Sequence, residues 1–138
     1  MKVLIDTNIA LDFLLQREPF FGDADALFEV IKNQQIEGFV TATTLTNIFY
    51  IVRKQTKSIE RAREAVAMTL ALEICDVNRN ILETAFASNL RDFEDAVQLA
   101  CAYAKNLDAI ITRNADDFAG ASLPILSVQQ LFEQINNS

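Results

Sequence analysis

The chain has 138 residues, which is long enough to bury one sizeable core and too short for two ordinary domains. A hydrophobic content of 51% with 22% charged residues excludes a disordered chain, and the apolar stretches are too short and too often interrupted by charges to span a bilayer. Twelve basic against 19 acidic residues give a net charge of −7, and a uniformly acidic surface repels nucleic acid.

Short apolar runs alternate with helical periodicity along the first half of the chain, a pattern typical of a mostly parallel sheet flanked by helices. Residues 3–5 predict a buried strand, and an apolar stripe at helical spacing predicts a helix over 20–31. Residues 38–41 predict a second strand. Two further stripes predict helices over 45–52 and 59–70.

The second half continues the same alternation. Ser127 is the expected cap of the last helix, with Gln130 as its capping-box partner. No repeat, low-complexity tract or linker divides the chain, so we expect one domain over residues 1–138: an α/β three-layer sandwich with a central, mostly parallel sheet flanked by helices. The elements predicted here are an edge strand at 73–77, helices over 81–86 and 93–104, strands at 109–112 and 124–126, and a helix over 128–135.

The residue types that the chain lacks or rarely contains exclude several kinds of catalytic and binding site. The chain has no His, which excludes Ser-His-Asp and Cys-His nucleophilic machinery and any His-ligated zinc site. Its three glycines are too few for a Gly-rich phosphate loop. If the protein is an enzyme, carboxylates must therefore carry the reaction, with or without a metal.

The expected compartment follows from the N-terminus and the cysteines. The first residues lack the long apolar region and the cleavage site of a signal peptide. Cys75 and Cys101 lie in apolar surroundings without paired spacing, so we expect both to be reduced core residues. These features predict a cytoplasmic protein that does not associate with a membrane.

Polar clusters lie at or beside three places where predicted strands end or helices begin: residues 6–8, 92–95 and 113–117. In open α/β sheets ligands bind beyond the carboxyl ends of the strands, and a parallel sheet brings such ends to one edge. Each cluster also has a simpler interpretation. Asp6 suits a helix N-cap, Asp92 and Asp95 a capping pair, and Asp117 a solvated turn.

Carboxylates that converge without a neutralising partner raise one another's pKa values. No lysine lies directly beside any of these acids in the sequence. Mg²⁺ or Mn²⁺ would resolve the conflict, because either ion takes oxygen ligands from a few carboxylates and keeps its remaining waters. Such an ion supports phosphodiester hydrolysis without His.

The ordered segments 3–8, 45–47, 92–96 and 112–118 together resemble the PIN-domain family. The resemblance runs across nearly the whole chain. It implies a ribonuclease dependent on Mg²⁺ or Mn²⁺ and, at this length, a toxin of the VapC kind. It also implies a small antitoxin as partner and a homodimer.

Carried over residue by residue, the resemblance implies that Asp6 and Asp95 hold the metal. The family's usual Glu falls on Asn47, and the acid expected after the Thr-Arg pair falls on Asn114, which leaves Asp117 as the nearest carboxylate. The implied catalytic residues are thus Asp6, Asn47, Asp95 and Asp117. Asn114 would complete the metal shell, and Asn47 would orient a water at the metal.

Residues beside these positions receive supporting roles. Thr7 and Asn8 would organise the first loop. Glu94 or Asp92 could supply the charge lost at the two amides, and the sequence does not rank them. The full supporting set is Thr7, Asn8, Asp92, Glu94 and Thr112.

A basic stretch interrupts the acidic chain: Arg53, Lys54, Lys57, Arg61 and Arg63, with the single acid Glu60 among them. One interpretation is a solvated helix face and turn. The other is a cationic rim that binds the RNA backbone or an acidic segment of an antitoxin.

Two other functions remain open at this point. With amides at two acid positions, the protein could be a degenerate PIN module that binds RNA or a protein without cleavage. A phosphatase or phosphoacceptor domain of the haloacid-dehalogenase kind is the third hypothesis. That class needs an Asp two residues after its nucleophile, where this chain has Asn8.

Overall fold

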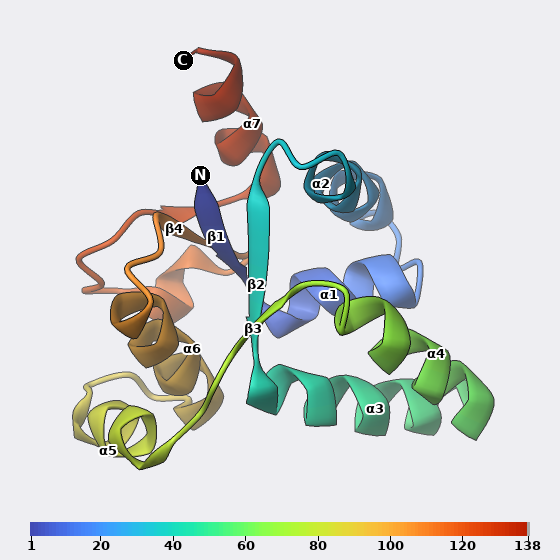
Figure 1. Ribbon diagram of the computed structural model, residues 1–138, viewed down its shortest axis with the longest axis horizontal. Helices are drawn as coiled ribbons and strands as arrows, with labels where there is room; N and C mark the ends of the chain where they lie inside the picture. Colours follow the sequence, from blue (N-terminus) through green and yellow to red (C-terminus); the bar gives the residue numbers. More distant parts are fainter. Residues whose placement is uncertain (138) are drawn as a thin grey trace.

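The computed structural model describes residues 1–137 and shows a five-stranded parallel sheet between two layers of helices (Figure 1). The strands lie in the order β3-β2-β1-β4-β5, and every neighbouring pair is parallel. The α/β class and the parallel sheet predicted from the sequence are confirmed. The strands are β1 (Lys2–Ile5), β2 (Glu37–Thr41), β3 (Glu73–Cys75), β4 (Ala109–Ile111) and β5 (Ile125–Leu126).

The helices divide between the two faces of the sheet (Figure 1). Five helices pack on one face: α1 (Thr7–Leu14), α2 (Phe21–Lys32), α3 (Ala42–Thr56), α4 (Ile59–Thr69) and α7 (Val128–Asn136). The other face is covered by α5 (Arg79–Ala87), α6 (Phe93–Ala104) and the short 3₁₀ helix η1 (Ala115–Phe118).

The central strand β1 shows why the chain folds into three layers. Successive side chains of a strand point to opposite faces. Val3 and Ile5 accordingly lie in the core beneath α1, and Leu4 lies in the core beneath α6. Because both faces of β1 are covered at Val3, Leu4 and Ile5, these three positions are all apolar, and only Lys2 at the exposed start of the strand is charged.

Several predicted boundaries agree with the structure. β3 is an edge strand, and Ser127 caps α7 through a capping box with Gln130. The helix η1 was not predicted, because four residues carry no periodic signal. No helix within residues 1–137 has both the length and the apolar character needed to cross a membrane.

The order of the strands places the site. Ile5 pairs with Ile111, so β1 and β4 end side by side. The backbone N–H of Asp6 donates to the carbonyl of Ile111 at 3.0 Å, and Thr112 follows directly. The residues that leave these two strands therefore meet at one edge of the sheet.

Candidate metal centre

Asp6 occupies the N-cap position of α1, but its side chain makes no capping hydrogen bond. Its Oδ1 instead accepts a hydrogen bond from Nε2 of Gln98 at 3.1 Å, and its Oδ2 accepts one from Oγ1 of Thr112 at 2.8 Å. Asp6 is only 4% exposed. The simple capping role that the sequence left open for Asp6 is therefore wrong, and its carboxylate is fixed at the edge of the sheet.

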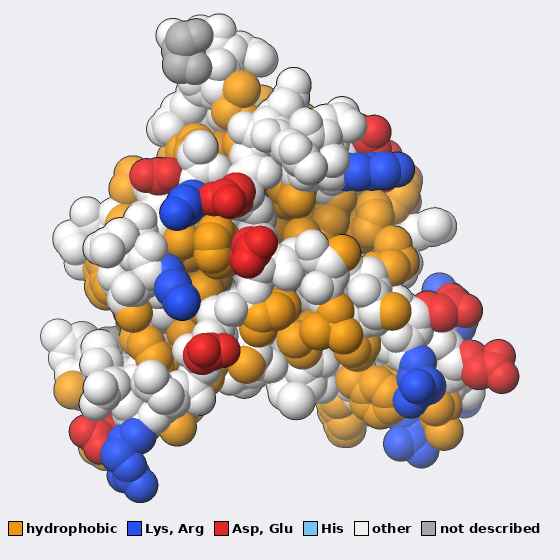
Figure 2. Space-filling model, viewed as in Figure 1, with side chains coloured by type: hydrophobic (Ala, Val, Ile, Leu, Met, Phe, Trp, Pro, Cys, Tyr) orange, Lys and Arg blue, Asp and Glu red, His pale blue; other side chains and the backbone are white. Residues whose placement is uncertain are grey.

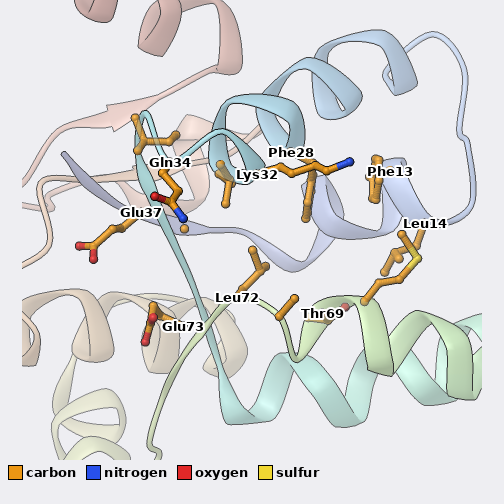
Figure 3. A pocket seen from close by; sticks show the side chains of 14 residues that line it. Phe13, Leu14, Phe28, Lys32, Gln34, Glu37, Thr69, Leu72 and Glu73 are labelled. Atoms are coloured by element: carbon orange, nitrogen blue, oxygen red, sulfur yellow. The ribbon is translucent and has the colours of Figure 1, made fainter.

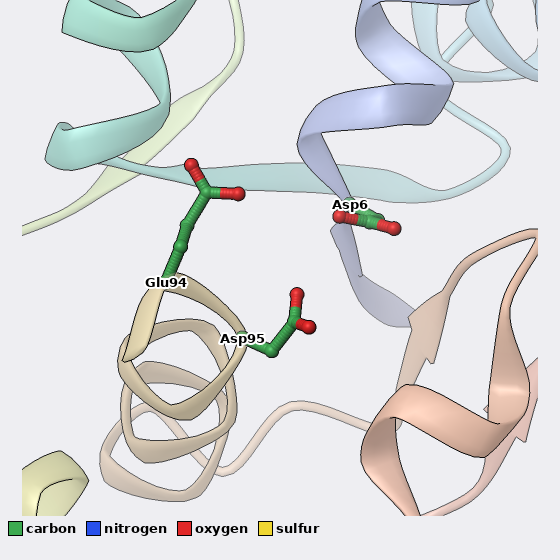
Figure 4. A group of neighbouring side chains, drawn as sticks. All are labelled: Asp6, Glu94 and Asp95. Carbon is green, nitrogen blue, oxygen red and sulfur yellow. The ribbon is translucent and has the colours of Figure 1, made fainter. Parts of the chain in front are cut away.

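Two acids of α6 approach Asp6. Glu94 and Asp95 lie in the first turn of this helix, and the side chain of Asp95 points toward Asp6 (Figure 4). One carboxylate oxygen from each of Asp6, Glu94 and Asp95 lies within 4.8 Å of the other two. We call these three residues the acid cluster.

Asp92 has a different role from Glu94. Its carboxylate accepts a hydrogen bond from the backbone N–H of Asp95 at 3.0 Å, which makes Asp92 the N-cap of α6. The structure thus separates two residues that the sequence could not rank. Glu94 belongs to the acid cluster, and Asp92 begins the helix that carries it.

The acids perturb one another's protonation. Burial, together with the charges of Asp92, Asp6, Asp117 and Glu94, raises the pKa of Asp95 to about 7. Burial and the charges of Asp6 and Asp92 also raise the pKa of Glu94. Asp117 is exposed on η1 and lies outside the acid cluster, although its charge acts on Asp95.

Arg113, which follows Thr112 in the chain, does not neutralise the acid cluster. Arg113 binds Asp12 of α1 instead, with Nε 2.7 Å from Oδ2 and Nη2 3.2 Å from Oδ1. Within residues 1–137, no Lys or Arg forms an ion pair with Asp6, Glu94 or Asp95.

The donor set fits a hard divalent cation. Three carboxylates converge without a positive partner, and carboxylate oxygens are the ligands that Mg²⁺ and Mn²⁺ prefer. Gln98 adds a second indication. Its Oε1 is buried and has no hydrogen-bond partner among the described residues, while the Nε2 of the same amide binds Asp6. A polar ligand at this site could satisfy that oxygen.

The two amides that occupy positions where acids were expected have different contacts in the structure. Asn47, on α3, donates a hydrogen bond from Nδ2 to Oε2 of Glu94 and so contacts the acid cluster. Asn114 is exposed, and its backbone N–H donates to Oγ1 of Thr112 at 3.0 Å. Asn114 therefore contacts the loop that supports Asp6.

The first loop contains a buried group of hydroxyls. Oγ1 of Thr7 lies 2.9 Å from Oγ1 of Thr44, which in turn lies 3.1 Å from Oγ1 of Thr41. These contacts join the start of α1 to the start of α3. Asn8, predicted to share this organising role, is exposed.

The five predicted RNA-binding cations lie on the last part of α3, the turn after it and the first part of α4. All are exposed, and Figure 2 shows basic side chains interspersed with acids over this arm of the molecule. Lys54 follows Asn47 by about two helical turns, or roughly 10 Å. These cations therefore flank the site rather than line it. The residues are Arg53, Lys54, Lys57, Arg61 and Arg63.

Two residues of the site were missed in the sequence. Gln98 is fully buried and lies one helical turn after Asp95, so its spacing was an available signal. Asp12 is also fully buried and interrupts the apolar run of α1, which is an unusual place for a charge.

A large hollow lies away from the acid cluster (Figure 3). Its volume is about 810 Å³, and it is bounded by α1, α2, the start of β2 and the end of α4. Phe13, Phe28, Met68 and Leu72 supply apolar lining, and Lys32 adds a charge. Figure 2 shows apolar side chains exposed in this part of the surface.

The model of the PIN-domain family matches residues 2–116. The chain belongs to the PIN-domain family. The match spans β1 to η1 and includes Asp6, Asn47, the first turn of α6 and Asn114.

Solved structures share this PIN fold. VapC20 of Mycobacterium tuberculosis, described as a sarcin–ricin loop cleaving toxin, aligns with a TM-score of 0.71 and 17% identity, over 85% of this chain and 93% of that one. A toxin–antitoxin complex from Klebsiella pneumoniae gives 0.68 and 24%, over 91% and 97%. VapBC2 of Rickettsia felis, bound to a promoter DNA fragment, gives 0.67 and 19%, over 92% and 98%. No curated protein sequence matches the chain significantly.

Proposed function

We propose that this PIN domain is an endoribonuclease that uses Mg²⁺ or Mn²⁺ and serves as the toxin of a toxin–antitoxin pair. The observation that carries the proposal is the acid cluster, in which Asp6, Glu94 and Asp95 lie within 4.8 Å without a cationic partner. A bound divalent ion would polarise a phosphodiester and favour ionisation of water. These two effects would allow hydrolysis without a His side chain.

The residues around the cluster would fix its geometry. Gln98 and Thr112 hold both oxygens of Asp6, so this carboxylate needs little reorganisation to bind an ion. Asn47 orients Glu94 through its amide hydrogens. Asp117 and Asn114 are proposed to complete the ligand shell from the loop after β4.

The test is cleavage of structured RNA by the purified protein with Mg²⁺ or Mn²⁺. We expect Asp6→Asn and Asp95→Asn each to lower the rate by at least about 100-fold, since each removes a charge from the site. Asp23→Asn, a change of an exposed acid on α2, is the matched control and should retain activity. Cleavage that survives both site substitutions would refute the proposed mechanism.

A second candidate function rests on the amides at positions 47 and 114. A PIN module with fewer charged ligands could bind RNA or a protein without cutting. RNA binding that is independent of metal and unchanged in Asp6→Asn, without cleavage by the wild type, would favour this alternative.

The proposed substrate and partners follow the descriptions of the structural relatives. One relative is described as a toxin that cleaves the sarcin–ricin loop, and others were solved as toxin–antitoxin complexes. We propose RNA as substrate, a small antitoxin and a second copy of the chain as partners, and the cytoplasm as the compartment.

We propose that the antitoxin covers the apolar hollow of Figure 3. Met68 lines this hollow and is 53% exposed, so Met68→Glu can change the surface without disturbing the core. Co-expression with a small protein encoded beside this chain should give a complex that Met68→Glu weakens. Ile59→Glu, at a residue that is 52% exposed at the opposite end of α4 and outside the hollow, should not weaken the complex.

The cations of α3 and α4 are proposed to bind phosphates of the RNA. Lys54→Gln should lower RNA affinity and reduce the salt dependence of binding by about one unit of slope. An unchanged salt dependence would indicate that Lys54 belongs to a solvated helix face, the simpler interpretation of this stretch.

A further inference from the structure

Asp12 forms a buried ion-pair network on α1, six residues after Asp6. Its side chain is fully buried, and Arg113 binds both of its carboxylate oxygens. Arg17 approaches the same carboxylate, with Nη1 3.7 Å from Oδ1. The guanidinium of Arg113 also lies over the ring of Phe20, 3.8 Å from its centre.

Arg113 is bonded in the chain to a residue that contacts the acid cluster. Thr112, the residue directly before it, donates a hydrogen bond to Asp6 at 2.8 Å. The acid cluster has no cationic partner among residues 1–137, although its three carboxylates lie within 4.8 Å of one another. An unrestrained guanidinium at position 113 would be attracted to these acids, because opposite charges interact strongly away from bulk water.

Stability alone is a weak reason to retain the Asp12–Arg113 pair. Desolvation of two charges can cost more than their attraction returns, so a buried ion pair often stabilises a protein no more than apolar residues do. The pair does fix the direction of a long, flexible side chain. Two hydrogen bonds and a ring contact hold Arg113 toward α1.

We propose that Asp12 is a positioning residue of the metal site, which holds Arg113 toward α1 and so leaves the acid cluster free for a divalent cation. The inference rests on the proposed function, since it requires that the cluster bind such an ion. It assigns to Asp12 an effect on ion affinity that is exerted entirely through Arg113.

The experiment is a double-mutant cycle with Mn²⁺ binding as the readout, measured by calorimetry without RNA. The proteins are the wild type, Asp12→Asn, Arg113→Gln and the double variant. We expect Asp12→Asn to weaken Mn²⁺ binding about tenfold, because a released Arg113 would bring its positive charge to the carboxylates that bind the ion. Arg113→Gln should stay within about twofold of the wild type, and the double variant should match Arg113→Gln.

The cycle separates this role from a purely structural one. If Asp12 only supported the fold, Arg113→Gln would weaken binding as well, and the double variant would not recover affinity. Either result overturns the inference, as does an unchanged affinity in Asp12→Asn. If the wild type binds no Mn²⁺, the proposed function fails and the inference fails with it.

Phe20→Leu keeps the test decisive if Asp12→Asn does not fold. Phe20 is 38% exposed, and its substitution loosens Arg113 without leaving a buried charge unpaired. We expect Phe20→Leu to weaken Mn²⁺ binding by about twofold to threefold and Phe20→Leu/Arg113→Gln to restore it. No change in Phe20→Leu, with the fold verified by urea unfolding, would count against the inference.

Discussion

The carboxylate of Asp6 is held by residues that lie far from it in the chain. Its neighbours make it a plausible helix cap, yet Gln98 and Thr112 hold its two oxygens. These partners come from α6 and from the end of β4, so the packing of these two elements holds the carboxylate in place.

Thr112→Val tests the importance of this support. The valine has a similar shape but leaves Oδ2 of Asp6 buried without its donor, so the free energy of unfolding should fall by about 1–3 kcal/mol. Urea unfolding without metal measures the change. Thr46→Val, at an exposed position of α3, is the control and should change stability by no more than about 0.5 kcal/mol. Equal effects at the two positions would contradict the role given to Thr112.

Asp95 makes stability depend on pH. Its pKa is raised to about 7 in the folded protein, from 3.8 in the unfolded chain, so the folded state holds this proton more tightly. The stability that Asp95 contributes is therefore complete below about pH 4 and is lost as the pH rises toward 7. Metal-free Asp95→Asn should gain stability relative to the wild type over the same interval.

Urea midpoints measured with a chelator at several pH values between 4 and 8 provide the test. Asp23→Asn is the control, because this acid is exposed on α2. A constant stability difference between Asp95→Asn and the wild type across this range would contradict the raised pKa. Mn²⁺ should show the opposite trend and bind more tightly as pH rises, because the ion must displace the proton.

At the scale of elements, two acids at the start of α6 have different roles: Asp92 caps the helix, and Glu94 belongs to the acid cluster. Asp92→Ala should destabilise the protein by about 1 kcal/mol through loss of the cap, and Asp92→Ser should restore most of it. Glu94→Gln should leave the cap intact and weaken Mn²⁺ binding about tenfold by removing a charge from the acid cluster. Unfolding and calorimetry on these variants measure the two effects. Equal Mn²⁺ affinity in Asp92→Ser and Glu94→Gln would contradict the assignment.

The elements themselves were largely predictable. Residues 3–5 and 109–111 are apolar throughout because both faces of their strands are buried, and α6 carries small residues where it packs on the sheet. Pairings between elements were not predictable in this way. Cys75 of β3 and Cys101 of α6 have no paired spacing, yet both are buried in the same core.

At the scale of the molecule, exposed apolar residues suggest where a second copy would bind. Leu82, Phe86 and Phe93 surround one hollow, and Phe86 is 83% exposed. Arg79 and Glu83 also line it, so two copies related by a two-fold axis could pair opposite charges across the contact.

We therefore expect a homodimer in sedimentation experiments that Phe86→Glu converts to a monomer. Burying a charge without a partner at such a contact is costly, which is the reason for the expected dissociation. Leu70→Glu, at a residue that directly follows α4 and is 57% exposed, is the control and should remain dimeric. A monomeric wild type would contradict the expectation, and dissociation of both variants would place the contact elsewhere.

The sequence by itself determined the α/β class, the strands and most helices, and the family to which the chain belongs. Periodicity and short ordered motifs are local properties, so one chain suffices to read them. Tertiary structure decided that Glu94 rather than Asp92 joins Asp6 and Asp95, and that Arg113 turns to Asp12. Adjacent residues of a helix point in different directions and a long side chain can reach several partners, so only the packing of β1, β4 and α6 fixes which charges meet.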